Sequence, residues 1–166
     1  MADLDHEQEP PADVPVPPTC PVMSAADLVG DRWILLILRD AFNGIRRFSQ
    51  FQRSLGIARN ILSARLSCLV AAGVLRTEPG ADGTSYHAYA LTDKGAELFD
   101  LIVALRQWGE HHLIDEGTSY RPLIDTRTGA PLSRVTYVRP DGTRLHPGET
   151  RLGEARPMTA EERSAT

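Results

Sequence analysis

The chain has 166 residues, 42% of them hydrophobic, and a formal net charge of -4. This length suits one compact domain with appendages, or a dimer that shares a core, and excludes two full domains. Because the sequence lacks a run of about 18 apolar residues and begins with acidic residues, we expect neither a membrane span nor a secretory signal, and a cytoplasmic protein. Two cysteines and five scattered histidines predict no disulfide framework, metal site or cofactor.

Composition divides the chain into four segments. Residues 1–19 hold five acidic side chains, five prolines and no Lys or Arg, which predicts a disordered acidic tail. Dense apolar periodicity over residues 20–116 predicts the domain. Over residues 117–152 Pro, Gly, Thr and Arg return, so we expect an accessory segment there. Residues 153–166 are predicted to be a second disordered tail.

The first half of the domain is predicted to be helical. Ser24 is a plausible N-cap for the first helix, and Asn43-Gly44 and Gly56 interrupt the later periodicity. Apolar spacing predicts helices over residues 24–30, 33–42, 49–55 and 58–72.

Residues 45–73 carry five arginines and no acidic residue in an otherwise acidic chain. Such a segment is typical of duplex DNA binding, although a solvated helix face is the alternative. On a helical wheel of the last helix, Leu62, Leu66, Leu69 and Val70 lie opposite Asn60, Ser63, Ala64 and Ser67, with Arg59 and Arg65 at the flanks. Small side chains let a helix enter the major groove, where Arg and Asn read bases and flanking arginines hold phosphates. An ordinary amphipathic helix has the same periodicity.

A hairpin and a long helix complete the predicted domain. Strands over residues 74–78 and 86–91 flank a turn-rich segment, so the fold class is mainly α with a small β-hairpin wing, a winged helix-turn-helix. Thr92 is predicted to cap one long amphipathic helix whose apolar stripe a small domain cannot cover. We therefore expect N- and C-terminal dimerisation helices and a homodimer interface formed by Leu28, Leu98, Leu101, Ile102, Leu105 and Trp108.

Several motifs occur in a fixed order between residues 20 and 116. They are Cys20-Pro21, GDRWILLILR at 30–39, GIRRFSQF at 44–51, LSARL at 62–66 and YALTDKG at 89–95. In these motifs the chain resembles the HxlR-type transcriptional regulators, relatives of the MarR-type winged-helix repressors. The resemblance implies a homodimer that binds inverted repeats in promoters, by default as a repressor, with residues 58–72 in the major groove and the hairpin near the minor groove. DNA contacts are expected from Arg32, Arg46, Arg47, Ser49, Arg59, Asn60, Ser63, Ala64, Arg65 and His87.

The chain departs from the family pattern in three places, one of which is Arg32 in Gly30-Asp31-Arg32, where a Gly-Lys pair is common. Ala58 stands where members usually carry Ser or Thr before the recognition helix, which removes the expected cap. The wing tip, over residues 81–87, lacks the usual proline and basic residue, so we expect less insertion into the minor groove.

Cys20 is a candidate redox sensor. It precedes Pro21, which favours the first turn of a helix, and the helix dipole stabilises an anionic thiol there. In some members of the resembled family a cysteine at this motif senses oxidants or electrophiles; the alternative is a small buried packing residue. A small-molecule effector held by Tyr86, Tyr89 and Trp108 is a further hypothesis, although such aromatic residues usually belong to the core.

Residues 133–145 predict a small hairpin around Pro140-Asp141-Gly142 in the accessory segment. Two function classes compete with a dimeric DNA-binding regulator. A winged helix can instead be a protein-interaction module whose arginine face meets an acidic partner. An enzyme is disfavoured, because the sequence offers no nucleophile with an obvious base, no paired carboxylates in an apolar setting and no phosphate-cradling loop.

Overall fold

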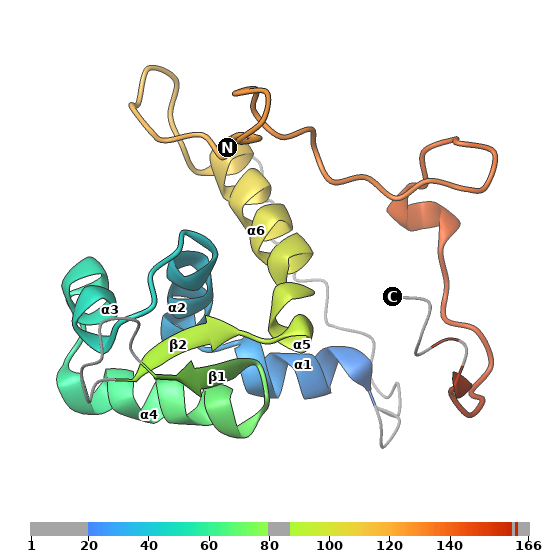
Figure 1. Cartoon of the computed structure of the whole chain (residues 1–166). Coiled ribbons are helices and arrows are strands. Elements are labelled where there is room, and N and C mark those ends of the chain that lie inside the picture. Colours follow the sequence, from blue (N-terminus) through green and yellow to red (C-terminus); the bar gives the residue numbers. More distant parts are fainter. Residues whose placement is uncertain (1–19, 80–86, 161, 163–166) are drawn as a thin grey trace, which may run out of the picture. The chain divides into compact units, whose positions relative to one another are not determined.

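The structure is a computed structural model that describes residues 20–79, 87–160 and 162 (Figure 1). The chain divides into two units, Met1–Leu105 and Arg106–Thr166, and the boundary between them falls inside the helix Phe99–His112. The predicted tail over residues 1–19 and part of the tail predicted over 153–166 lie outside the described residues. The domain limits at residues 20, 116 and 152 stay predictions. None of the helices in the described ranges is long and apolar enough to cross a membrane.

The first unit is a winged helix. Its elements, in chain order, are α1 (Pro21–Val29), α2 (Arg32–Phe42), α3 (Phe48–Leu55), α4 (Arg59–Ala71), β1 (Leu75–Glu78), β2 (Ala88–Leu91), α5 (Asp93–Ala96) and the start of α6 (Phe99–His112). The two strands are antiparallel, with Leu75 opposite Leu91 and Glu78 opposite Ala88. The predicted fold class, mainly helical with a small hairpin wing, is confirmed.

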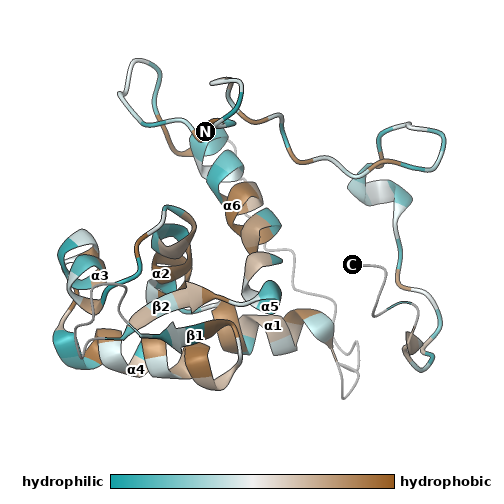
Figure 2. Cartoon of the chain, in the orientation of Figure 1, coloured by the Kyte–Doolittle hydropathy of each residue, from teal (hydrophilic) through white to brown (hydrophobic). Residues whose placement is uncertain are grey.

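The core of this unit lies between α2, α3, α4 and β1, where the three helices contact one another and β1 contacts α4 (Figure 1). Its fully buried side chains include Ile37 and Leu38 of α2 and Phe51 of α3. Leu62, Leu66 and Leu69 of α4 are also fully buried, as the helical wheel predicts. Figure 2 shows the resulting mixture of hydrophobic and hydrophilic residues along α4.

The predicted start of the first helix is wrong. Helix α1 begins at Pro21 with Cys20 as its N-cap, so Ser24 lies inside the first turn, where its hydroxyl donates to the carbonyl of Cys20 at 3.2 Å. The physical reason is Pro21, whose fixed φ suits the first helical position and whose missing N–H costs nothing there.

The single long helix predicted after Thr92 is also wrong. Thr92 accepts a hydrogen bond from the Gly95 N–H at 3.1 Å, but it caps only the short α5, and the helix is interrupted before Phe99. Close packing on the two residues before β1 explains the break: the Thr92 hydroxyl donates to the Gly73 carbonyl at 2.6 Å, and a Cβ on Gly95 would lie 2.1 Å from the carbonyl oxygen of Val74. The segment is therefore tied to the start of the wing before α6 begins.

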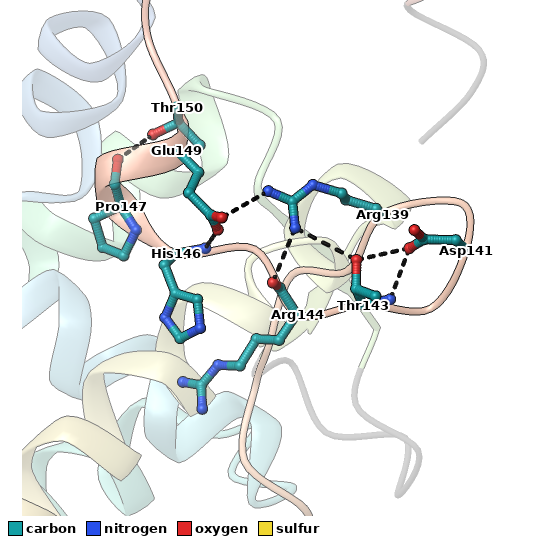
Figure 3. Close-up of polar contacts among 8 residues, drawn as sticks. All are labelled: Arg139, Asp141, Thr143, Arg144, His146, Pro147, Glu149 and Thr150. Atoms are coloured by element: carbon teal, nitrogen blue, oxygen red, sulfur yellow. Dashed lines mark hydrogen bonds and ion pairs between the residues drawn. The ribbon is translucent and has the colours of Figure 1, made fainter.

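The second unit contains two narrow hairpins. The predicted one is present: Leu145 N–H donates to the Tyr137 carbonyl and Arg139 N–H to the Thr143 carbonyl, both at 2.8 Å. Asp141 closes its turn by accepting from the backbone and hydroxyl of Thr143 (Figure 3). A second hairpin, in which Leu132 N–H donates to the Leu123 carbonyl at 3.1 Å, was not predicted.

A short 3-10 helix, η1 (Pro147–Glu149), follows the predicted hairpin. Arg139 joins the two, because its guanidinium lies 3.1 Å from the Glu149 carboxylate and 3.2 Å from the Arg144 carbonyl (Figure 3). On α6, the Gln107 side chain donates to the Ser133 carbonyl and accepts from the Val135 N–H. The hydrogen bonds and ion pairs therefore order the second unit, in which few of the described apolar residues are buried.

Candidate nucleic-acid interface

Helices α3 and α4 form a helix-turn-helix with a tight connection over residues 56–58. Gly56 ends α3 in the left-handed region, with φ of 60°, and its N–H donates to the Gln52 carbonyl at 3.0 Å. Ile57 is buried and anchors the turn. Ala58 precedes α4 with extended backbone and offers no side-chain cap, so it satisfies none of the first amide groups of α4 through its side chain.

The outer face of α4 is small and polar. Asn60, Ser63, Ala64, Ser67 and Cys68 are all exposed along it. Arg59 is exposed at its N-terminal end, where its guanidinium carbon lies 5.1 Å from the centre of the Phe48 ring. This cation–π contact links the start of α4 to α3 and restrains a long side chain beside the helix terminus.

Arg65 is not a free cation. Its guanidinium donates to the Asp31 carboxylate at 2.9 Å, although the two residues lie far apart in the sequence. This hydrogen bond lowers the pKa of the Asp31 carboxyl and raises the pKa of Arg65. Sequence reasoning placed Arg65 on the phosphates and missed Asp31, since the local segment over residues 45–73 contains no acid.

Arg46 has an acidic partner as well. Its guanidinium lies 2.6 Å from Glu78 at the end of β1, and Arg76 of β1 lies 2.8 Å from the other oxygen of the same carboxylate. Arg76 also donates to the Leu91 carbonyl at 2.7 Å. The sequence reasoning passed over both Arg76 and Glu78, and their opposite charges two residues apart on a predicted strand were the available signal.

The loop before α3 lies along the wing. The Tyr89 N–H donates to the Arg46 carbonyl at 2.7 Å, and Arg47 forms a β-bridge with Ala88. The Arg47 N–H also donates to the Gln50 side chain at 3.0 Å. The loop that carries Arg46 and Arg47 is therefore fixed between the helix-turn-helix and the wing.

The other predicted contact residues are exposed. The Arg32 guanidinium lies 4.8 Å above the Trp33 ring at the start of α2, Ser49 lies in the first turn of α3, and His87 directly precedes β2. The predicted weak insertion of the wing tip concerns residues 81–87, of which only His87 is described.

The predicted dimer residues fall into two groups. Leu28, Leu98 and Ile102 are partly buried and pack on the unit's own core. Leu101, Leu105 and Trp108 of α6 are 44%, 49% and 52% exposed. Hydrophobic residues also colour the middle of α6 in Figure 2. Val22 and Met23 of α1 are further exposed apolar residues that the sequence analysis did not select.

The candidate sensor and effector residues have different surroundings. Cys20 is half-buried at the N-terminus of α1, Cys68 is exposed on α4, and both are free thiols. Tyr89 packs edge-to-face on Phe51, with 6.3 Å between the ring centres, and is one of the partly buried residues against the core. Burial raises the pKa of its hydroxyl. Tyr86 lies outside the described residues. Within the described ranges, no three His, Cys, Asp or Glu side chains gather closely enough to hold a metal ion.

A helix-turn-helix followed by a two-stranded wing defines a winged-helix DNA-binding protein. More specifically, the chain belongs to the HxlR-like helix-turn-helix family, which matches it over residues 28–117. It is 51% identical over 89 residues to the uncharacterized HTH-type transcriptional regulator Rv3095 of Mycobacterium tuberculosis. That match covers 54% of this chain and 56% of the relative, so the chain spans just over half of the relative's length.

Solved structures agree with this assignment. The crystal structure of PA1607, a candidate transcription factor, is 44% identical with a TM-score of 0.79, over 84% of this chain and 97% of that one. The oxidized form of the redox regulator HypR is 27% identical with a TM-score of 0.53, over 58% of this chain and 100% of that one. These comparisons confirm the predicted family, whose relatives are named as helix-turn-helix transcriptional regulators.

Proposed function

We propose that this regulator is a homodimer that binds inverted repeats in promoter DNA and represses transcription from them, with residues 20–116 as the DNA-binding and dimerisation domain. The observation that carries the proposal is the outer face of α4, where small polar side chains stay exposed while Leu62, Leu66 and Leu69 are fully buried behind them. A helix of this kind can approach base edges closely, because the side chains of Asn60, Ser63, Ala64 and Ser67 are small, and the exposed Ile61 lies at the edge of this face.

The proposed contacts separate into base readers and phosphate ligands. Arg59 and Asn60 have the donor and acceptor groups that pair with guanine and adenine, and Ser63 and Ala64 continue the same face. Phosphate contacts are assigned to the exposed residues around this face, namely Arg32, Arg46, Arg47, Ser49 and His87.

The proposed dimer interface lies on α6. Leu101, Leu105 and Trp108 are large apolar side chains that are about half exposed at helical spacing. A second copy of the helix would remove them from water, at roughly 1.5–3 kcal/mol for each fully buried side chain. A twofold dimer then presents two copies of α4 to half-sites about one helical turn apart.

A chemical signal is proposed to act through Cys20. The thiol is half-buried at the N-terminus of α1, and the similar protein HypR is described as a redox regulator. Oxidation or alkylation of this thiol would change the contacts at the start of α1. A small-molecule effector is the alternative to an oxidant.

The test is a binding titration of the purified protein with a fragment of its own upstream region and with a scrambled fragment, at two salt concentrations. We expect preference for the upstream fragment, steep loss of affinity with salt, and two protomers per site. A reporter driven by the same fragment should lose expression when the protein is supplied. Equal affinity for both fragments would reject sequence-specific binding and favour an acidic protein partner for the arginine face.

A further inference from the structure

Asp31 connects the starts of two helices through one side chain. Its Oδ1 atom accepts from the Trp33 N–H at 2.9 Å and the Ile34 N–H at 3.2 Å, and so caps α2. Its Oδ2 atom accepts from the Arg65 guanidinium of α4 at 2.9 Å. The cap orients the carboxylate, and the carboxylate in turn orients Arg65.

Arg65 is held on the side of α4 rather than released to solvent. Its side chain is 37% exposed and that of Asp31 is 33% exposed, so the ion pair lies partly buried at the edge of the α2–α4 contact. The Nε atom of Arg65 is buried and has no hydrogen-bond partner among the described residues. By contrast, Arg59 on the same helix is exposed beside an aromatic ring.

From these contacts, and resting on the DNA-binding role proposed above, we propose that Asp31 is a specificity-determining residue that positions Arg65 away from the DNA phosphates. Phosphate contacts attract every sequence alike, so each cation withheld from the backbone lowers non-specific affinity more than it lowers base reading. Arg65 then anchors the recognition helix, and discrimination is left to the outer face of α4.

The experiment compares Asp31→Asn with the wild type in salt titrations against a scrambled DNA fragment. Asn keeps the N-cap acceptor but removes the charge that holds Arg65. One additional phosphate contact steepens the slope of log affinity against log salt by about 0.9, which is roughly a threefold larger affinity loss between about 50 and 200 mM salt. We expect this change, with a smaller preference for the upstream fragment.

Two further variants isolate the cause. In Asp31→Asn/Arg65→Gln the slope should return to the wild-type value, because the released cation is gone. Asp27→Asn, which removes an exposed acid of α1 that has no ion pair among the described contacts, should leave the slope unchanged and so accounts for net charge. Asp31→Ser, another neutral cap, repeats the test if the Asn variant folds poorly, as judged by its thermal unfolding.

The proposal is overturned if Asp31→Asn has the wild-type slope, or if the steeper slope persists in the double variant. These outcomes differ from failure of the proposed function, in which the wild-type protein itself shows no preference for its upstream fragment. The salt slopes are measured on scrambled DNA and do not depend on knowing the operator.

Discussion

Replacing both base readers at the start of α4 should remove sequence discrimination. Arg59 and Asn60 are exposed in the first turn of the helix, and neither side chain fills the core. Each good contact of this kind contributes about 1–3 kcal/mol of discrimination, so Arg59→Ala/Asn60→Ala should lose about 2–6 kcal/mol. Even the lower figure reduces the preference for the operator roughly 30-fold.

The assay is competition between the upstream and scrambled fragments at constant salt, with thermal unfolding as a folding control. Alanine is the best helix former and both sites are exposed, so the unfolding midpoint should change little. Arg53 is an exposed arginine of α3, so Arg53→Ala is the matched control and should keep the preference for the upstream fragment. If the double variant loses affinity equally for both fragments, the recognition face has been assigned to the wrong residues.

Other predictions concern the dimer, the sensor and the fold. Leu101→Asp/Leu105→Asp should give a folded monomer by light scattering, because both side chains are exposed in the single chain; an unchanged mass places the interface elsewhere. Cys20→Ser should bind DNA normally and ignore a mild oxidant, whereas an oxidant response that survives in this variant excludes Cys20 as the sensor. Gly95→Ala should destabilise the fold by about 1–3 kcal/mol in urea unfolding, since its Cβ would meet the Val74 carbonyl oxygen at 2.1 Å; an unchanged midpoint contradicts the close packing.

The sequence predicts the parts of this fold that depend on local pattern. Apolar periodicity and glycine breaks located the four helices and the hairpin to within a few residues, because burial on one face repeats at the helical or strand period. The break between α5 and α6 escaped this reasoning. It depends on the packing of Gly95 against Val74, and no periodicity records a contact between segments that distant.

The same distinction applies to the candidate site. The exposed face of α4 could be read from its own residues, but the state of its flanking arginines could not. Arg65 and Arg46 find their carboxylates 34 and 32 residues away, on Asp31 and Glu78. A segment that is wholly basic in sequence therefore becomes partly neutralised in the folded protein.

This partial neutralisation bears on why the proposed regulator would need two copies of its domain. When Asp31 holds Arg65 and Glu78 pairs with Arg46, a single winged helix offers fewer cations to the phosphate backbone than its sequence suggests, and its sequence-independent affinity is correspondingly lower. Two domains joined through α6 would make twice as many base contacts at an inverted repeat. On random DNA the second domain would add only the weaker phosphate contacts. Weak non-specific attraction per domain combined with paired readout raises the specificity ratio, which is the quantity that decides operator occupancy among many competing sites.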